Sequence, residues 1–428
     1  MSLCVFQKPP NAPEESDGYD DLQPYHRLTK VFRFTDFDQS QWWNNTGSML
    51  AKLFSQCGYS LDQQYQYLCM YGLNIIPFLG PWPHPGRPEI FRSVLSGLGT
   101  IEMSQNFTKS GRTVRLGIEP ASFAASTGRD IYNRHAIGDA LLHWKQLGIK
   151  IDLTMYHELV SEITLTDEDE EALRKNNTWG KQPDKTQNLL GLDFKGDDVV
   201  FKMYFYPQMK SLATGISRAQ LLWNAVRKVD KDGRYKEALS MVEDYFNSVP
   251  EDVVTPYWTS CDLIEPHLTR FKFYISLFQV DLEHAMDLWT LGGRISSPES
   301  IATFALVREL WEALGVQDGL RKLGNYPLEV DIAANVVPML FNIEIIPGNA
   351  IPRVKAYFST TGMNDLEVAQ VVTEFLRRHG MEKHAESYVA NLVSYVPWID
   401  LNNVTTLQAW VSLAYTEKEG LYVSLYYH

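Results

Sequence analysis

The stretch RFKFY, residues 270–274, alternates strictly between polar and apolar side chains. Its two cations and its tyrosine fall on one face, and its two phenylalanines fall on the other. The same Lys-x-Tyr pair returns in KMYFY (202–206) and in RVKAYF (353–358). Alternation of this kind is typical of an antiparallel strand whose apolar face packs on a core. A solvated face does not need the same pair three times, so the recurrence indicates strands that contribute to one shared site.

Five segments of the chain have the pattern of β-hairpins, in which two alternating strands flank a short polar turn. The expected strand pairs are 101–107 with 112–118, 188–194 with 199–206, 257–264 with 269–275, 338–345 with 353–358, and 409–415 with 421–427. Stretches with apolar residues at helical spacing lie between the hairpins, such as 217–229, 235–249 and 364–380. The sequence therefore predicts a repeated helix–strand–strand–helix unit.

Ten antiparallel strands can close into a barrel, which leaves no exposed sheet edge. Helices outside the barrel would bury the apolar strand faces, so the polar faces would line a lumen. A ten-stranded barrel is wider than the eight-stranded kind that side chains fill, and it has room for ligands. The predicted fold class is α+β, an αββα barrel of ten antiparallel strands inside a ring of helices. We expect residues 23–428 to form this single domain after a flexible N-terminal tail of residues 1–22.

The composition narrows the classes of partner. The chain has 428 residues, 45% of them hydrophobic, and a formal net charge of -13, which argues against binding to nucleic acid or to an anionic membrane. Its four cysteines lack the spacing of metal ligands, and no segment has the length and apolarity of a membrane span. We expect a cytoplasmic protein with reduced thiols, and a homodimer remains open.

The cations on the polar strand faces require a counter-charge. Lys202, Arg270, Lys272 and Lys355 would all line the lumen, and the strands that carry them offer few carboxylates. Cations that are desolvated together are costly unless an anion joins them. We therefore expect an anionic ligand, most simply a phosphate. Tyrosines beside the lysines could donate to phosphate oxygens, and their rings could face a carbocation.

Two acidic features leave alternatives open. Glu102 and Arg115 of the first hairpin would both face the lumen, so Glu102 either pairs with a neighbouring cation or accepts the N–H of a neutral aromatic substrate. The run TDEDEEAL (166–173) superficially resembles an Asp-rich metal motif. Thr166 followed by acids is better explained as a helix N-cap with acids in the first turn. We accordingly expect no metal site.

An ordered set of motifs spans nearly the whole chain. It runs through WWNNTGSMLAKLF (42–54), LGPWP (79–83), IEMSQNF (101–107), VRLGIEP (114–120), FKMYFYPQMKS (201–211), RFKFY (270–274), LWTLGG (288–293), KAYFSTTGMND (355–365) and AYTEKEGLYVSLYYH (414–428). In this order the motifs resemble the fungal indole prenyltransferases of the dimethylallyltryptophan synthase type. The resemblance implies an αββα barrel that transfers a dimethylallyl group from its diphosphate to an aromatic carbon or nitrogen, without a metal or other cofactor.

The resemblance also implies roles for individual residues. A diphosphate clamp would consist of Arg115, Lys202, Arg270, Lys272 and Lys355, and a tyrosine shield around the allyl cation would consist of Tyr204, Tyr274, Tyr357 and Tyr426. Glu102 would accept the indole N–H as the ring attacks the cation. Tyr206 would border the acceptor, and Leu340 stands where the family gauges the length of the prenyl chain.

The chain departs from the family members that use free tryptophan. Those members carry Arg at the positions of Tyr257 and Thr416, where they hold the amino-acid carboxylate, and a Lys base at the position of Leu189. A buried carboxylate without a partner is costly, which argues against free tryptophan as the acceptor. Trp410 stands where some members have another shield tyrosine, as is frequent in members that accept tryptophan-containing cyclic dipeptides. The resemblance therefore favours a cyclic dipeptide or a related indole alkaloid of secondary metabolism.

Two other functions remain open at this stage. The same barrel could prenylate a non-indole polycyclic aromatic, although such a substrate would not require Glu102 as an N–H acceptor. The barrel could also bind a phosphorylated metabolite without catalysis, although simple phosphate binding would not require layered tyrosines. The favoured partners are dimethylallyl diphosphate and an indole acceptor.

Overall fold

The ten strands expected from the sequence form a closed antiparallel barrel in the computed structural model. Around the ring they follow the order β1, β12, β11, β10, β9, β6, β5, β4, β3 and β2. Their bounds are β1 Ile101–Thr108, β2 Gly111–Ile118, β3 Asn188–Lys195, β4 Asp198–Phe205, β5 Val254–Asp262, β6 Phe271–Leu277, β9 Met339–Ile345, β10 Arg353–Ser359, β11 Gln408–Thr416 and β12 Gly420–Tyr427. The predicted barrel is confirmed, and each of its strands begins and ends within three residues of the bounds expected from the alternating pattern.

The structure describes residues 22–84, 93–95, 97, 99–175, 185–322, 333–416 and 420–428, and of Thr416 it describes only the backbone. The tail predicted for residues 1–22 lies outside the described residues except for Leu22. Within these ranges, the structure contains no helix with the length and apolarity needed to cross a bilayer.

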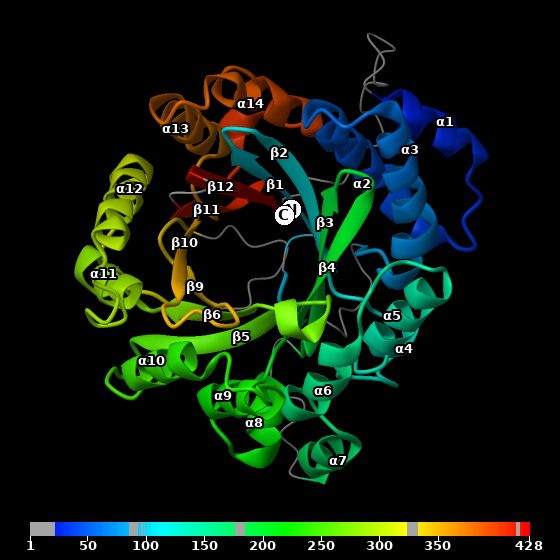
Figure 1. Cartoon of the computed structure of the whole chain (residues 1–428). Helices are drawn as coiled ribbons and strands as arrows, with labels where there is room; N and C mark the ends of the chain where they lie inside the picture. Colours follow the sequence, from blue (N-terminus) through cyan, green and yellow to red (C-terminus); the bar gives the residue numbers. More distant parts are fainter. Residues whose placement is uncertain are drawn as a thin grey trace.

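Helices fill the connections between the hairpins and surround the ring of strands (Figure 1). Within the described ranges the α-helices are α1 Gln23–Val31, α2 Phe37–Gln56, α3 Leu61–Met70, α4 Phe123–Ser126, α5 Ala136–Gln146, α6 Thr154–Ile163, α7 Asp167–Lys175, α8 Gln208–Thr214, α9 Arg218–Val229, α10 Lys236–Phe246, α11 Leu282–Thr290, α12 Pro298–Leu314, α13 Asp365–Arg378 and α14 Glu382–Tyr395. Shorter helical turns are η1 Tyr71–Ile75, η2 Ile76–Phe78, η3 Pro266–Leu268 and η4 Leu401–Asn403. A small second sheet pairs β7 Gln279–Val280 with β8 Gly319–Leu320, and these strands are too short to show an alternating pattern in the sequence.

Aromatic side chains of the helices meet aromatic side chains on the outer faces of the strands. The contacting pairs, with ring centroids 4.5–6.4 Å apart, are Phe54 with Phe194, Trp144 with Phe201, Trp223 with Phe273, Trp311 with Phe358, and Tyr388 with Phe107. Burial of one such ring contributes about 1.5–3 kcal/mol, and the pairing of two rings adds roughly 0.5–1.5 kcal/mol. The apolar face of the barrel is therefore its outer face, which directs the polar face into the lumen.

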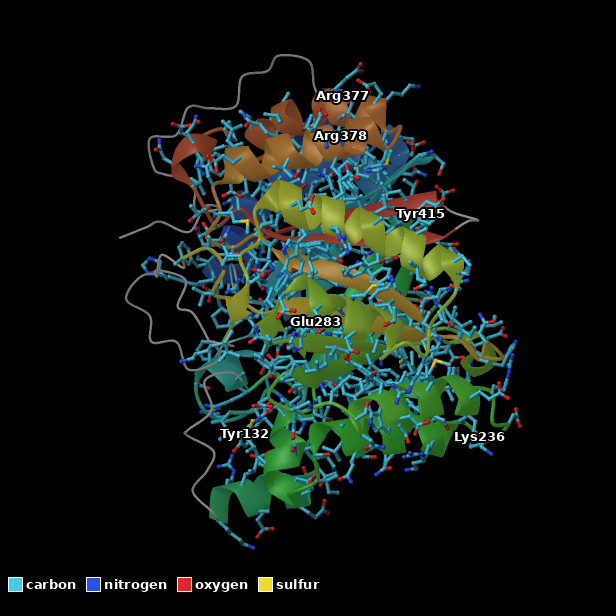
Figure 2. The ribbon with its side chains drawn as sticks, turned by 90° about the vertical axis from the view of Figure 1, so that its left-hand side faces the viewer. Tyr132, Lys236, Glu283, Arg377, Arg378 and Tyr415 are labelled. Atoms are coloured by element: carbon cyan, nitrogen blue, oxygen red, sulfur yellow. The ribbon has the colours of Figure 1, made fainter. Side chains whose placement is uncertain are left out.

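The opposite sides of the helices face solvent. Figure 2 views the molecule from the side and labels Lys236 of α10, Glu283 of α11 and Arg377 of α13, all of which are exposed. These helices are amphipathic, with an apolar stripe toward the strands and charged residues away from them.

The acidic run at residues 166–173 begins α7. The Thr166 N–H donates to Asp169 Oδ2 at 2.9 Å, and the Asp169 N–H donates to Thr166 Oγ1 at 3.3 Å. Asp169 also pairs with Lys210 Nζ at 2.6 Å. The N-cap interpretation is thus confirmed, because side chains of this run satisfy the free N–H groups at a helix start.

Candidate active site

Alternate residues of each barrel strand point into the lumen, because the others are covered by helices. Three strands carry the Lys-x-Tyr pair at these inward positions: Lys202 and Tyr204 on β4, Lys272 and Tyr274 on β6, and Lys355 and Tyr357 on β10. Every second strand of an antiparallel ring runs in the same direction, so the step from lysine to tyrosine points the same way in all three. Inward positions lie about 6.6 Å apart along a strand. The lysines therefore form one layer of the lumen and the tyrosines form the next.

Carboxylates from the first strand of three hairpins lie among these cations. Asp193 on β3 contacts Arg115 Nε at 3.0 Å and Lys202 Nζ at 2.5 Å. The strands that carry the predicted clamp lysines offer few carboxylates, as expected, but a carboxylate of the neighbouring strand reaches both cations. Register places Asp193 beside Arg115 on one neighbouring strand, and Lys202 lies across the hairpin on the other.

The same arrangement recurs on the other side of the ring. Asp262 of β5 accepts from Arg270 Nε at 2.8 Å, and Glu344 of β9 lies 3.0 Å from Arg270 Nη1 and 3.2 Å from Lys272 Nζ. Together with Asp193, these carboxylates number three against the five cations of the predicted clamp. When all of these groups are ionised, the layer has a formal excess of two positive charges, so it is suited to an anion.

Lys355 differs from the other four cations. Within the described residues its ammonium has no carboxylate partner; it donates to Ser424 Oγ at 3.1 Å and lies over the rings of Tyr357 at 5.0 Å and Tyr422 at 4.8 Å. Arg115 also donates a hydrogen bond to Tyr422 Oη. Part of the positive charge of this layer is thus held only by a hydroxyl and by the faces of aromatic rings.

The ionisation of the lumen groups follows from this packing. Burial and, next, the neighbouring cations Arg115 and Lys272 lower the pKa of Lys202 to about 7, against the opposing effect of Asp193. Burial and the other lumen cations lower the pKa of Lys355 well below its usual range. Burial alone would raise the pKa of the Asp193 carboxyl, but its cationic partners outweigh burial and lower that pKa. The carboxylates are therefore ionised, whereas the two lysines would gain from a further anion.

The aromatic layer is a separate cluster inside the lumen. Tyr274, Leu340 and Tyr357 form its buried centre, and the half-buried side chains that pack against them are Tyr204, Trp258, Trp410 and Tyr426. Neighbouring rings are spaced at 5.7 Å (Tyr204 and Tyr274), 6.0 Å (Tyr274 and Tyr357) and 6.0 Å (Tyr357 and Tyr426). Burial raises the pKa of Tyr204 and of Tyr357 well above the usual value, so both phenols stay neutral and can donate hydrogen bonds. The structure thus brings together all four tyrosines of the predicted shield, together with Leu340 and Trp410.

The remaining predicted acceptor residues lie at the edge of this layer. Leu189 of β3 pairs in register with Tyr204 and is buried. The rings of Tyr206 and Tyr257 lie 5.1 Å apart, and the guanidinium of Arg218 lies 5.5 Å from the centre of the Tyr257 ring. The side chain of Thr416, the other departure from the tryptophan-specific pattern, lies outside the described part of the structure.

Glu102 has a partner that the sequence did not indicate. Its Oε2 forms a hydrogen bond with Nε2 of His428, and both side chains are largely buried. The interpretation that Glu102 pairs with Arg115 is wrong, because Arg115 instead contacts Asp193 and Tyr422. Glu102 lies opposite Gly117 in the β1–β2 ladder. Because glycine has no side chain, no side chain of β2 at this position separates Glu102 from the lumen.

Sequence reasoning missed several lumen residues, among them Asp193, Trp258, Asp262, Glu344 and His428. Asp193 and Glu344 share the inward face of their strands with Leu189 and Leu340, so the same alternation could have found them. Trp258 and Asp262 share the inward face of β5, but the register irregularity between Pro256 and Trp258 puts Tyr257, the predicted residue of that strand, out of phase with them. His428 needed the pairing of β1 with β12, in which Ser104 lies opposite Tyr426. Two residues further along, the same register places Glu102 opposite His428. Within the described residues, no group of three or more His, Cys, Asp and Glu side chains is arranged to hold a metal ion.

The chain is similar to known proteins over almost its whole length. The family model described as tryptophan dimethylallyltransferase matches residues 38–391. The roquefortine prenyltransferase roqD of Penicillium rubens is 38% identical over 429 residues, covering 100% of this chain and 98% of that protein. The deoxybrevianamide E synthase notF of an Aspergillus species is 33% identical, covering 100% of this chain and 97% of that protein.

Solved structures show the same architecture. The crystal structure of AnaPT from Neosartorya fischeri has a TM-score of 0.84 at 28% identity, covering 95% of this chain and 97% of that one. The structure of NotF in complex with brevianamide F and DMSPP has a TM-score of 0.81 at 32% identity, covering 95% of this chain and 98% of that one.

Proposed function

The chain belongs to the tryptophan dimethylallyltransferase family and is a prenyltransferase, and from that premise we propose how its lumen works. The proposed reaction transfers the dimethylallyl group of dimethylallyl diphosphate to the indole of a tryptophan-containing cyclic dipeptide or a related indole alkaloid. The observation that carries this proposal is the layering of the lumen, in which a cation layer with excess positive charge adjoins a cluster of neutral aromatic rings. We further propose that residues 23–428 act as one catalytic domain.

The cation layer would bind the diphosphate and stabilise it as it leaves. We assign this role to the five clamp residues, which are Arg115, Lys202, Arg270, Lys272 and Lys355. Charge on the departing diphosphate grows as the C–O bond breaks, and cations fixed in place stabilise that growth without reorganising. The carboxylates of the layer are already engaged in ion pairs with these cations. We therefore propose that the reaction needs no metal cofactor.

The aromatic cluster would protect the allyl cation. Faces of tyrosine and tryptophan rings attract a cation, and an enclosed apolar wall keeps water from capturing it. Tyr204, Tyr274, Tyr357 and Tyr426 could also donate hydrogen bonds to the diphosphate from their neutral hydroxyl groups. Leu340, buried at the centre of the cluster, would limit the length of the prenyl chain.

The acceptor would enter from the side of Glu102. As the indole ring attacks the allyl cation, positive charge develops on the ring nitrogen, and its N–H becomes a stronger donor. A carboxylate that accepts this hydrogen bond is worth most in the transition state, so it accelerates the reaction rather than only tightening binding. Tyr257 offers no charge for an amino-acid carboxylate, which supports a neutral acceptor, although the half-buried guanidinium of Arg218 lies 5.5 Å from the centre of the Tyr257 ring.

The prenylation of a non-indole aromatic remains the second candidate for the acceptor, because the cation and aromatic layers would serve either substrate. The non-catalytic alternative is set aside by the family to which the chain belongs.

A panel of acceptors tests the proposal. The purified protein is incubated with dimethylallyl diphosphate and, separately, a cyclic dipeptide with tryptophan, the same dipeptide with phenylalanine, free tryptophan, and a naphthol. We expect a mass gain of one dimethylallyl group on the tryptophan dipeptide, with much lower turnover of the other three. Preferred turnover of the naphthol or of free tryptophan would refute the proposed acceptor class.

A further inference from the structure

We propose that His428 is a positioning residue that holds the Glu102 carboxylate in place to accept the acceptor's N–H. This inference rests on the proposed indole acceptor. The imidazole Nε2 would donate to Glu102 Oε2, which leaves Oε1 for the substrate. The hydrogen bond from His428 would hold the carboxylate in one orientation before the substrate arrives.

The geometry of Glu102 supports this division of its oxygens. Oε1 lies 3.5 Å from the position that a Cβ atom on Gly117 would occupy. Because Gly117 has no side chain, Oε1 lies over backbone atoms at this point. Within the described residues, no hydrogen bond is formed to Oε1. His428 engages the other oxygen, and both side chains are mostly shielded from bulk water, with 10% (His428) and 14% (Glu102) exposed.

His428 is itself held by backbone on two sides. Its N–H donates to the carbonyl of Leu407 at 3.1 Å, immediately after the end of β12. Gly97 packs so closely against it that a Cβ on Gly97 would lie 2.5 Å from Cβ of His428, and Gly97 also has φ +49°. The imidazole therefore has little freedom to leave Glu102. In the view of Figure 1, the end of the chain, marked C, lies inside the ring of strands.

The charges of the lumen explain why such a support is needed. Arg115 lies two residues before Gly117 on β2, so this clamp cation is one inward position, about 6.6 Å along the strand, from the residue opposite Glu102. A carboxylate drawn to the clamp would neutralise a cation intended for diphosphate and would lose contact with the acceptor. Tyr426, also near Glu102, is a neutral group and cannot hold a carboxylate by charge. A hydrogen bond from His428 keeps the carboxylate on the acceptor side.

Three substitutions of His428 separate positioning from packing. His428→Gln retains an N–H donor near the place of Nε2, His428→Asn has a donor that is too short to reach, and His428→Leu has none. We expect kcat with a tryptophan dipeptide to fall about tenfold to a hundredfold in the Leu and Asn variants, the value of a hydrogen bond to a charged group. The Gln variant should recover most of that loss, and the KM for dimethylallyl diphosphate should stay within about twofold of wild type.

Two further comparisons make the test specific. With an acceptor methylated on the indole nitrogen, His428→Leu should cause no additional loss, because there is no N–H for Glu102 to accept. In the double variant with Glu102→Gln, the effect of His428→Leu should disappear, since both changes act on one contact. Melting temperatures of all variants identify any that are misfolded, and the Gln and Asn pair still decides the question if the Leu variant does not fold.

The inference is overturned if the Gln and Asn variants behave alike, if the methylated acceptor loses as much as the N–H acceptor, or if the losses of the double variant multiply. These outcomes require that wild type prenylates the tryptophan dipeptide, so they leave the proposed function intact. If wild type instead prefers an acceptor without an N–H, the proposed function and the role of His428 both fail.

Discussion

Replacing Lys355 with methionine should make the protein more stable and less active. Lys355 is the clamp cation without a carboxylate partner among the described residues, and its pKa is lowered by burial and by the cations around it. Methionine has similar length and flexibility but no charge. Removing an uncompensated cation relieves desolvation and repulsion; for comparison, replacing a buried ion pair by apolar residues stabilises proteins by up to about 1–4 kcal/mol. We expect the lower part of that range, about 1–2 kcal/mol, because Lys355 is only half-buried.

The size of the shift in melting temperature follows from the length of the chain. An unfolding entropy of roughly 2.1 cal/mol/K per residue gives about 0.9 kcal/mol/K for 428 residues. A gain of about 1–2 kcal/mol therefore raises the apparent melting temperature by only about 1–2 °C. Loss of one fixed cation from the departing diphosphate should lower kcat/KM by about a hundredfold to a thousandfold.

Lys202→Met is the matched control. It removes the same charge but leaves Asp193 with Arg115 as its main partner, and breaking a buried ion pair is destabilising. Activity should fall in both variants, whereas the melting temperature should rise for Lys355→Met and fall for Lys202→Met. Differential scanning fluorimetry at one scan rate and steady-state kinetics measure both quantities. A lower melting temperature in Lys355→Met, or near-normal turnover, would refute the reasoning.

Four other predictions concern the same lumen. Lys272→Ala should raise the barrier by roughly 2–4 kcal/mol through lost charge stabilisation, and near-normal turnover would show that Lys272 does not face the diphosphate. Glu102→Gln should lower kcat by about a hundredfold, or roughly 3 kcal/mol, with the KM for diphosphate and the melting temperature little changed; an unchanged kcat with a lowered melting temperature would remove its catalytic role. Because the pKa of Lys202 is about 7, this cation loses its charge above neutral pH, and the affinity for dimethylallyl diphosphate should fall as the pH rises through 7. Bound diphosphate would raise the pKa of Lys202, and Lys202→Arg should weaken the pH dependence because arginine stays charged. An unchanged pH profile in the Lys202→Arg variant would contradict the assignment. Turnover should survive excess EDTA, and a complete loss that magnesium restores would overturn the clamp as the substitute for a metal.

The alternation of polar and apolar residues was sufficient to predict the barrel, because each hairpin carries its own turn and its own register. It also placed the Lys-x-Tyr pairs correctly in the lumen, since the apolar face had to meet the helices. The ion pairs could not be inferred from one strand at a time. Asp193 and Glu344 became visible as partners only when neighbouring strands were set in register.

The contact between Glu102 and His428 was harder still to infer from single strands. Hairpin patterns identify which strands are consecutive, but they do not show which strands close the ring. Glu102 and His428 are 326 residues apart in the sequence and meet only across the β1–β12 pairing. The small β7–β8 sheet was missed for another reason, because two residues cannot show a period.

The β1–β12 pairing also has a consequence for how the protein folds. Every other pair of neighbouring strands in the ring is joined by a hairpin turn or by a single chain segment that contains helices. The β1–β12 pair instead joins strands from opposite ends of the barrel sequence. Contacts between segments so distant in the chain form slowly, since most of the intervening chain must be ordered first. We expect the hairpins and their helices to assemble early and the β1–β12 pairing, the seam of the barrel, to form late. Until it forms, the unpaired edges of β1 and β12 could pair with strands of other chains. The carboxylate that would receive the acceptor lies on that seam, so a nearly complete barrel with an open seam would retain most of its secondary structure and still lack its acceptor site.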